Sequence, residues 1–169
     1  MAEIEIERKY VISMPSIEKL MAECGFASSA ITQIYLNSDA GVTHRVRKRE
    51  FSDGVKYYET RKTRIDKMSA VEDEREISGE EYAALSKNIK MGTSPITKTR
   101  YTFLSRGKLI EIDVYPEWKN TCILETELTD REEEVKLPDY IEIIKEVTGC
   151  FEYSNASMAR SFPKELSIK

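Results

Sequence analysis

Apolar and charged side chains alternate along eight segments of this chain, and this two-residue period is the feature that most restricts its fold. Side chains of a β-strand point to opposite faces in turn, so each segment predicts a strand with one apolar and one charged face. Turn residues at 52–54 (Ser-Asp-Gly) and 105–107 (Ser-Arg-Gly) predict two hairpins. The predicted strands cover residues 3–12, 31–38, 42–50, 55–64, 70–78, 96–105, 108–115 and 121–129.

Helical spacing is confined to a few segments. Residues 16–24 place apolar side chains on one face, with a proline before them and a glycine after them. The sequence Ser-Gly-Glu-Glu at 78–81 predicts a capping box that starts a helix ending near residue 89. A proline and a glycine delimit a third predicted helix over residues 138–149, and a short one is predicted near residues 154–161.

Eight strands against three or four helices predict a single β-rich α+β domain over residues 1–169. So many strands in so short a chain favour a sheet that curls or closes into a barrel. The sequence contains no linker, no low-complexity tract and no repeat of fixed period.

The balance of charge excludes several classes of protein. The chain has 26 Lys and Arg against 30 Asp and Glu, and 33% of its residues are charged, above the roughly 25% typical of soluble domains. This argues against a uniformly basic protein that binds duplex nucleic acid and against a disordered acidic chain. No apolar run approaches the roughly 20 residues of a membrane span, and the acidic, alternating start of the chain is unlike a signal peptide.

The three cysteines, Cys24, Cys122 and Cys150, have no paired spacing, which argues against a disulfide framework and against a zinc site. We therefore expect a reducing compartment, the cytoplasm. Cys24 and Cys122 occupy apolar positions of a predicted helix and a predicted strand, so we expect both in the core. The single histidine, His44, points away from Arg45 in a strand, and we expect it to pack or lie at the surface rather than to catalyse.

The charged faces of the predicted strands mostly carry one sign each. Residues two apart in a strand share a face and lie about 6.7 Å from each other. The basic rows are Arg45, Arg47 and Arg49, then Lys98 and Arg100, with Lys62 in the strand between them. The acidic rows are Glu72, Glu74 and Glu76, then Glu111 and Asp113, then Glu125 and Glu127. The first strand mixes both signs on one face, with Glu5, Glu7 and Lys9.

Two orientations of these faces agree with the pattern. In the first, the apolar faces cover a core and the charged faces lie in water, where like charges at this spacing repel by only about half a kcal/mol. In the second, the sheet closes with the charged faces inward, and a polar tunnel runs through a barrel. Such a tunnel would suit a polyanion on its cations and Mg²⁺ or Mn²⁺ on its carboxylates.

The order of the motifs resembles that of the CYTH superfamily, the triphosphate tunnel metalloenzymes. The Glu-x-Glu-x-Lys pattern at 5–9 resembles the family's N-terminal signature. The resemblance covers nearly the whole chain. Its basic motifs are at 45–47 (Arg-Val-Arg), 60–62 (Thr-Arg-Lys) and 98–101 (Lys-Thr-Arg-Tyr), and its acidic motifs are at 72–77, 111–113 and 125–127.

This resemblance implies a closed eight-stranded antiparallel barrel that hydrolyses or cyclises a small-molecule triphosphate with Mg²⁺ or Mn²⁺. The metal ligands that it implies are Glu5, Glu7, Glu125 and Glu127, with Glu74, Glu111 and Asp113 as further candidates. The phosphate-binding residues that it implies are Lys9, Arg45, Arg47, Lys62, Lys98 and Arg100. The catalytic residues that it implies are Lys9, Glu7, Lys62, Glu76 and Asp113.

Some residues depart from the family's pattern. Arg49, Arg61 and Arg64 match no motif, so we expect them outward or at the tunnel mouth. Relatives often carry basic residues around the C-terminal tyrosine, whereas Glu152 precedes Tyr153 here and the next positions are uncharged. This leaves open whether the C-terminal segment supplies a cation to the tunnel.

The leading interpretation is a metal-dependent hydrolase of inorganic triphosphate, since the short chain and its Glu-Ile-Glu-Arg-Lys start most resemble the small bacterial tripolyphosphatases. A nucleoside or thiamine triphosphate stays open as the substrate. The alternatives are a class IV adenylate cyclase and a non-catalytic module that binds polyphosphate or nucleotide. A homodimer is common among the family's members.

Overall fold

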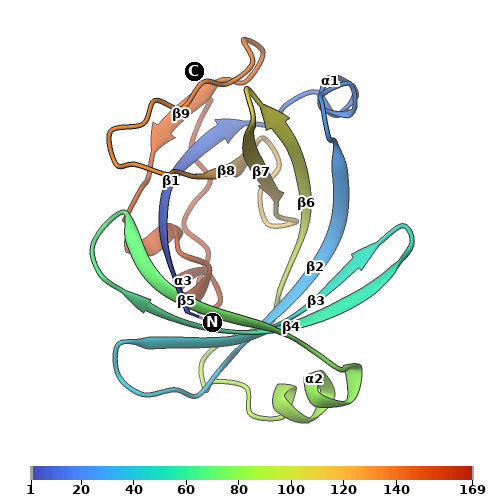
Figure 1. The fold of residues 1–169 in the computed structure, drawn as a ribbon, viewed down its shortest axis with the longest axis vertical. Coiled ribbons are helices and arrows are strands. Elements are labelled where there is room, and N and C mark those ends of the chain that lie inside the picture. Colours follow the sequence, from blue (N-terminus) through green and yellow to red (C-terminus); the bar gives the residue numbers. More distant parts are fainter. Residues whose placement is uncertain (1, 169) are drawn as a thin grey trace.

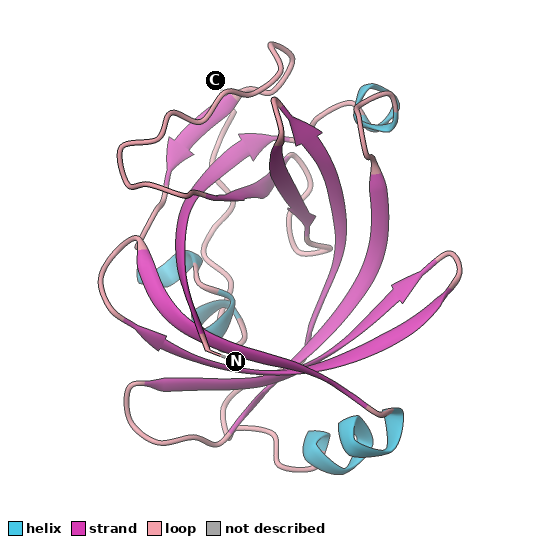
Figure 2. Cartoon of the chain, in the orientation of Figure 1, coloured by secondary structure: helices cyan, strands magenta, loops and turns pink. Residues whose placement is uncertain are grey.

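One antiparallel sheet makes up most of the molecule and closes on itself (Figures 1 and 2). The computed structural model describes residues 2–168. Within this range the strands are β1 (Glu3–Ser13), β2 (Ala27–Leu36), β3 (Val42–Phe51), β4 (Gly54–Arg64), β5 (Ser69–Ile77), β6 (Ile96–Ser105), β7 (Lys108–Val114), β8 (Thr121–Glu127) and β9 (Ile143–Glu146).

Closure of the barrel depends on β1. The strands lie side by side in the order β5-β4-β3-β2-β6-β7-β8-β1, and β1 also pairs with β5, in a register that runs from Glu3 opposite Glu72 to Ile6 opposite Ser69. Eight strands therefore complete a ring, and β9 adds to the outside of that ring by pairing with β1. The predicted closed eight-stranded barrel is confirmed.

The helices are short. They are α1 (Ile17–Met21), α2 (Gly79–Ser86), a 3₁₀ turn η1 (Phe151–Tyr153) and α3 (Asn155–Met158). The predicted capping box at the start of α2 is confirmed, because Ser78 accepts from the backbone of Glu81 while the Glu81 side chain accepts from the backbone of Ser78. The helix predicted to end near residue 89 ends at Ser86.

The helix predicted over residues 138–149 is wrong. Residues 143–146 are the strand β9, in which Tyr10 of β1 lies opposite Glu146. The segment is rich in β-branched side chains, at Ile141, Ile143, Ile144 and Val147, and these favour extended backbone. An open edge of β1 supplies the partner that the extended backbone requires.

One of the two cysteine predictions is also wrong. Cys122 is buried, as expected, but Cys24 is exposed. The reason is that α1 ends at Met21, so the helical spacing that predicted a buried Cys24 does not continue to it. His44 is buried and packs on the outer face of the barrel, where its Nε2 lies 2.7 Å from Glu59 Oε1.

Apolar side chains cover the outside of the barrel and also fill one end of its inner face. Outside β1, β6, β7 and β8, a core cluster packs against α1, and a smaller cluster lies under α2. The third cluster surrounds Trp118 and includes Val11, Ile123, Tyr153 and Met158. Val11 and Ile123 share the inner face with Lys9 and Glu125, so the C-terminal segment packs into one end of the bore.

The C-terminal segment contacts the β4–β5 turn at Gly149, and this contact generates a test of the fold. A Cβ at position 149 would lie 2.6 Å from the Cβ of Lys67 and 2.8 Å from its carbonyl oxygen, whereas one at Gly107 would meet nothing within 4 Å. Both glycines have positive φ, 70° and 78°, so alanine at either position costs about 1–2 kcal/mol of backbone strain. We expect Gly149→Ala to lower the free energy of unfolding by a further 1–3 kcal/mol, roughly the cost of overpacking, as measured by urea denaturation. Equal losses in the two variants would contradict the close contact.

Candidate active site

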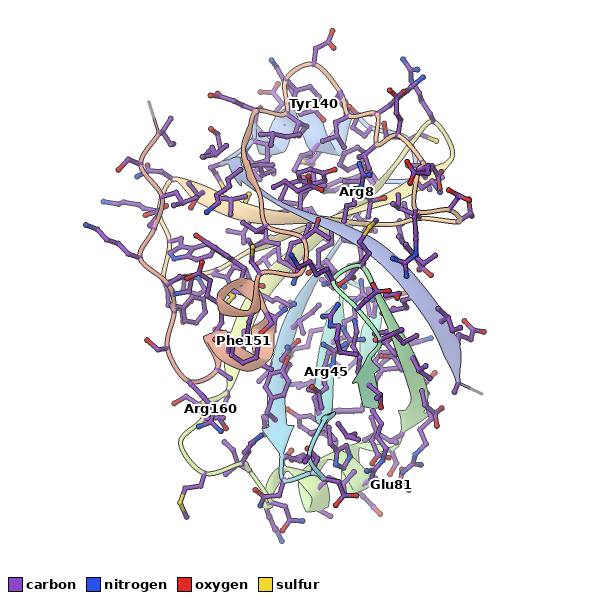
Figure 3. All side chains as sticks on the ribbon, turned by 90° about the vertical axis from the view of Figure 1, so that its left-hand side faces the viewer. Arg8, Arg45, Glu81, Tyr140, Phe151 and Arg160 are labelled. Carbon is purple, nitrogen blue, oxygen red and sulfur yellow. The ribbon has the colours of Figure 1, made fainter. Side chains whose placement is uncertain are left out.

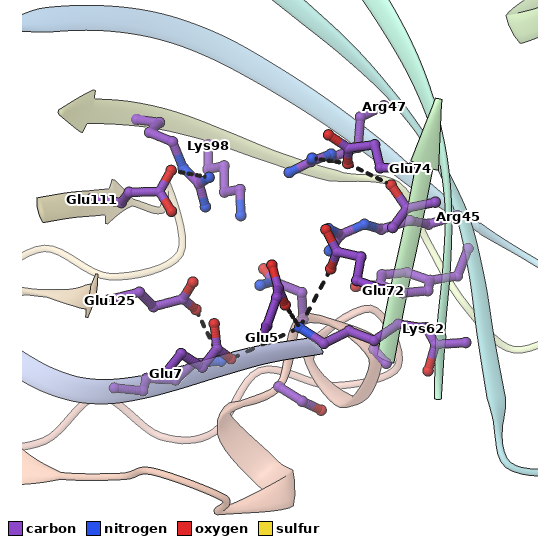
Figure 4. A pocket seen from close by; sticks show the side chains of 18 of the residues that line it. Glu5, Glu7, Arg45, Arg47, Lys62, Glu72, Glu74, Lys98, Glu111 and Glu125 are labelled. Carbon is purple, nitrogen blue, oxygen red and sulfur yellow. Dashed lines mark hydrogen bonds and ion pairs between the residues drawn. The ribbon is translucent and has the colours of Figure 1, made fainter. Parts of the chain in front are cut away.

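The bore of the barrel contains a cavity of about 260 Å³ in which the acidic and basic rows face one another (Figure 4). This arrangement excludes the interpretation in which the charged faces lie in bulk water. The eight cations that line it are Lys9, Arg45, Arg47, Arg49, Lys62, Arg64, Lys98 and Arg100. The six carboxylates that line it are Glu5, Glu7, Glu72, Glu74, Glu111 and Glu125.

Strand register brings these rows together. Lys9 of β1 lies opposite Glu125 of β8, which in turn lies opposite Glu111 of β7. On the far side of the ring, Arg45 of β3 lies opposite Thr60 of β4, and Thr60 lies opposite Glu74 of β5. Directly opposed residues of an antiparallel pair share one face, so the period of two in each strand becomes a belt of charge around the bore.

Four carboxylates, on Glu5, Glu7, Glu72 and Glu125, and two lysines form the acidic side of the bore. Lys9 Nζ lies 3.0 Å from Glu125 Oε1, and Lys62 Nζ lies 2.8 Å from Glu5 Oε2 and 3.9 Å from Glu7 Oε1. Burial raises the pKa of Glu7, and the nearby charge of Glu125 adds to this, although Lys62 and Lys9 oppose it. Burial would also raise the pKa of Glu125, but the neighbouring cations, Lys9 first, outweigh it and hold this pKa at about 2.

A buried ion cluster lies behind the basic side of β6. Asp113, 1% exposed, accepts from Lys98 Nζ at 2.7 Å and from Arg100 Nε and Nη2 at 2.7 and 2.8 Å. Burial lowers the pKa of Lys98 to about 8, although Asp113 opposes the shift. Arg100 also donates to Glu111 Oε2 at 2.6 Å. Both oxygens of Asp113 are therefore engaged in holding two cations whose side chains line the bore.

The arginines of β3 are less fully paired. Arg47 Nη2 donates to Glu74 Oε2 at 2.6 Å, and Arg49 Nε donates to Ser29 Oγ at 2.9 Å. The Nε atoms of Arg45 and Arg47 are buried, and within residues 2–168 they have no hydrogen-bond partner. A buried donor without an acceptor costs about 1–3 kcal/mol, and an anion in the bore could supply the missing acceptor.

Most of the predicted site residues line the bore. Those that do are Glu5, Glu7, Lys9, Arg45, Arg47, Lys62, Glu74, Lys98, Arg100, Glu111 and Glu125. Asp113 shares the inner face but is buried at its packed end, opposite Ile123, and does not line the cavity, while Glu76 and Glu127 are exposed. Glu127 lies opposite Glu7 in register and so shares its face.

Several lining residues were missed by the motif comparison. Arg49, which we expected outward or at the mouth, lines the bore and is half-buried. Arg64 lines the bore and is exposed, which agrees with the expected position at its mouth, and Arg61 is exposed as expected. The two-residue period of the strands indicates that Arg49 and Glu72 face the bore, because Arg49 follows Arg47 by two positions and Glu72 precedes Glu74 by two. The C-terminal segment contributes Ser154, Asn155 and Ala156 to the cavity wall and no cation from the part that the structure describes, and Arg160 is exposed.

Glu5, Glu7 and Glu125 are the acidic side chains on one side of the bore whose oxygens could hold a hard divalent cation. Lys62 lies beside Glu5 and Glu7 (Figure 4), and Lys9 pairs with Glu125. Accordingly, no group of three or more His, Cys, Asp or Glu side chains in the described range has the geometry of a ready-made metal site. A metal would have to compete with Lys9 and Lys62 for these oxygens.

The closed barrel with opposed acidic and basic rows is the triphosphate-tunnel fold of the CYTH proteins, as the sequence resemblance implied. The structure is similar to that of the inorganic triphosphatase NE1496, with a TM-score of 0.58 and 25% identity over 94% of this chain and 96% of that one. It also resembles the PH1819 protein from Pyrococcus horikoshii OT3, with a TM-score of 0.59 and 22% identity over 75% of this chain and 80% of that one.

HpAC1 from Hippeastrum, an adenylyl cyclase candidate with a dominant triphosphatase activity, has a TM-score of 0.50 and 18% identity, over 75% of this chain and 81% of that one. No protein-family model and no curated protein matches the sequence. Across residues 2–168, the structure contains no helix with the length and apolar character needed to cross a membrane.

The ion cluster around Asp113 predicts a large effect of removing one charge. Asp113→Asn leaves Lys98 and Arg100 buried without their shared carboxylate, so we expect the free energy of unfolding to fall by about 3–5 kcal/mol in urea denaturation. Glu50→Gln is the matched control, because the Lys48–Glu50 pair is exposed at 3.0 Å and should contribute less than about 1 kcal/mol. Similar small losses in both variants would contradict the importance of the buried cluster.

Proposed function

We propose that this protein hydrolyses inorganic triphosphate in its bore with the help of Mg²⁺ or Mn²⁺. The observation that carries the proposal is the presence of two buried arginine donors without an acceptor, at Arg45 and Arg47, in a bore whose other side is acidic. A phosphate chain supplies acceptors to these donors, and its bound cation suits the carboxylates. The similarity to an inorganic triphosphatase over nearly the whole chain supports the same activity.

The donor set fits a magnesium or manganese ion. Its members are carboxylate oxygens, which hard cations prefer, and burial together with Glu125 raises the pKa of Glu7, so this group of like charges gains from a cation. We propose that Glu5, Glu7 and Glu125 bind the metal and that Glu127 extends the site toward solvent. When bound, the metal neutralises phosphate charge and lowers the pKa of water.

Glu74, Glu111 and Asp113 are weaker candidates for metal ligands, since each is held by an arginine, whereas Glu5 and Glu125 pair with lysines. Glu74 pairs with Arg47, Glu111 with Arg100, and Asp113 with both Lys98 and Arg100. We propose that Asp113 is a positioning residue, which holds Lys98 and Arg100 toward the bore. A catalytic role for Glu76 stays a prediction, because its side chain is exposed and does not line the cavity.

Phosphoryl transfer requires positioning and charge stabilisation more than covalent help from the protein. In the proposed reaction, water attacks the terminal phosphorus, the bond from that phosphorus to the bridging oxygen breaks, and pyrophosphate leaves beside orthophosphate. Arg45, Arg47, Lys98 and Arg100 bind the phosphate oxygens, and Lys9 and Lys62 stabilise the charge that develops on the leaving and transferred groups. Glu7 is the proposed acceptor of the proton of the attacking water.

A product assay separates this function from its alternatives. Purified protein is incubated with Mg²⁺ or Mn²⁺ and with inorganic triphosphate, ATP or thiamine triphosphate. Orthophosphate and pyrophosphate from inorganic triphosphate support the proposal. Pyrophosphate with cyclic AMP from ATP would indicate a cyclase, and binding without turnover would indicate a non-catalytic module. A homodimer, a cytoplasmic location and the exclusion of duplex nucleic acid as a partner stay predictions.

Two substitutions test the proposed residues. We expect Lys9→Ala and Glu7→Gln each to lower the hydrolysis of inorganic triphosphate by at least about a hundredfold, because each removes a charge placed at the reacting group. Phosphate release is measured at saturating substrate, and circular dichroism checks that the fold survives. Arg8→Gln is the control, since Arg8 belongs to the same strand but to its outer face. Wild-type rates in the two bore variants would contradict the assignments.

Metal removal provides a further test. We expect EDTA to abolish phosphate release and added Mg²⁺ or Mn²⁺ to restore it, because without a metal the carboxylates of the bore repel the phosphate chain and the pKa of the attacking water is not lowered. Full activity in EDTA after exhaustive dialysis would show that the carboxylates serve another purpose.

A further inference from the structure

The barrel wall has no continuous ladder along one side of β1. On that side β5 pairs with β1 only as far as Ile6, and β9 pairs with it only from Tyr10 onward. Residues 7–9, which include the proposed reacting groups of Glu7 and Lys9, therefore have no strand partner there. Backbone groups that point into this gap need partners from elsewhere in the chain.

The C-terminal segment supplies partners for both backbone groups of Lys9. Val147 N donates to Lys9 O at 2.8 Å, and Lys9 N donates at 3.0 Å to the side-chain hydroxyl of Thr148. In an ordinary antiparallel ladder a backbone carbonyl would accept this second hydrogen bond. Figure 3 shows this part of the chain passing β1 on its way to the turn that contains Phe151. One side-chain oxygen therefore replaces a strand carbonyl at Lys9.

The Thr148 hydroxyl is itself held in place. As a donor it lies 3.1 Å from Glu146 Oε1, closer than to Lys9 O at 3.4 Å, and its oxygen still accepts from Lys9 N. The preceding residue, Val147, is completely buried in the cluster that surrounds Trp118. Packing and hydrogen bonding therefore fix the acceptor that Lys9 N requires.

The same segment also contacts the side chain of Lys9. Lys9 Nζ donates to the backbone oxygen of Tyr153 at 3.3 Å and lies 3.0 Å from Glu125 Oε1. A lysine ammonium has three donors, so these two partners leave one donor for a ligand in the bore. Residues 147–153 therefore hold Lys9 at its backbone N, its backbone O and its Nζ.

We propose that Thr148 is a positioning residue, which fixes the backbone of Lys9 and so the direction in which its ammonium group enters the bore. The inference rests on the proposed function in taking Lys9 as a group that stabilises charge on the reacting phosphate. Thr148 does not line the bore, and it acts on the reaction only through Lys9. A displacement of about 1 Å can lower a rate about a hundredfold, so the loss of this anchor should be measurable in the rate.

The test removes the acceptor and keeps the shape of the side chain. In Thr148→Val a methyl group replaces the hydroxyl, so Lys9 N loses its partner, whereas Thr148→Ser retains the hydroxyl. We expect Thr148→Val to lower kcat for inorganic triphosphate about tenfold and to change KM by less than about threefold, because the arginines of the bore still bind the phosphate chain. Thr148→Ser should keep kcat within about twofold of the wild type.

Amide hydrogen exchange reports on the hydrogen bond itself, without substrate. We expect the Lys9 amide to exchange at least about tenfold faster in Thr148→Val than in the wild type or in Thr148→Ser, as measured by NMR. Leu128 N donates to Ile6 O at 2.7 Å on the opposite side of β1, the side that pairs with β8. Its exchange rate should not change, so it serves as an internal reference.

Two further variants complete the test. Thr93→Val removes another half-buried threonine hydroxyl, which donates to Lys90 O at 2.6 Å and lines neither the bore nor the gap beside β1. This control should leave kcat and the exchange rate of the Lys9 amide unchanged. Thr148→Ala also removes the hydroxyl, and it should reproduce the effects expected of Thr148→Val if valine at this position prevents folding.

Three results would overturn the proposal: an unchanged exchange rate of the Lys9 amide in Thr148→Val, an unchanged kcat in that variant, or an equal loss of kcat in Thr148→Val and Thr148→Ser. Exchange and turnover are read separately, so the two hypotheses fail in different ways. Faster exchange at Lys9 in Thr148→Val, with no hydrolysis by the wild type, would refute the hydrolase and retain the anchoring of Lys9. Hydrolysis by the wild type with unchanged exchange in the variant would do the reverse.

Discussion

Charge that is taken out of water must find a partner, and this constraint organises the whole interior of the barrel. Asp113 is the clearest case, because it lies almost completely buried between Lys98 and Arg100. Around it, acidic and basic side chains pair along the wall, between adjacent strands or strands two apart. Pairing is not complete, since the Nε atoms of Arg45 and Arg47 are buried without an acceptor within the described chain. These two unpaired donors are the ones that the proposed phosphate chain would satisfy.

The same constraint explains how apolar surface is distributed. Charged side chains occupy much of the inner face of the barrel. Most apolar side chains of the strands therefore lie on its outer face, where α1, α2 and the 135–141 segment cover them. One end of the inner face is the exception. There Val11 and Ile123 meet Trp118 and the C-terminal segment, which brings Ser154 and Asn155 to the wall of the bore. A segment distant in sequence thus helps to shape the site without adding charge.

On one of its two sides, β1 has no continuous strand partner. A strand of 11 residues is shared by two partners on the same side, and neither of them reaches Glu7 or Lys9. Loops close this part of the wall less regularly than a strand would, and a cavity lies there, next to the proposed metal and phosphate groups.

Much of the fold and the site could be predicted from sequence, because both depend on a local period. Alternation located the eight barrel strands and grouped Arg45 with Arg47 and Glu5 with Glu7 on common faces, and the order of the motifs indicated the tunnel. The same alternation grouped Arg49 and Glu72 with these rows, although the family motifs assigned neither residue to the site.

Other features were decided only by contacts between distant segments. The period of two is identical whether a charged face points inward or outward, so only ring closure by β1 and β5 determines that the rows meet. Residues 143–146 become a strand because β1 offers a free edge, which no local spacing reveals. By alternation Asp113 shares a face with the lining residue Glu111. Its side chain is nevertheless buried and does not line the cavity, because Lys98 and Arg100 of the neighbouring strand pack on it. The sequence determined which side chains share a face, and the tertiary structure determined what each face meets, because burial and pairing are properties of segments that come together only in the folded chain.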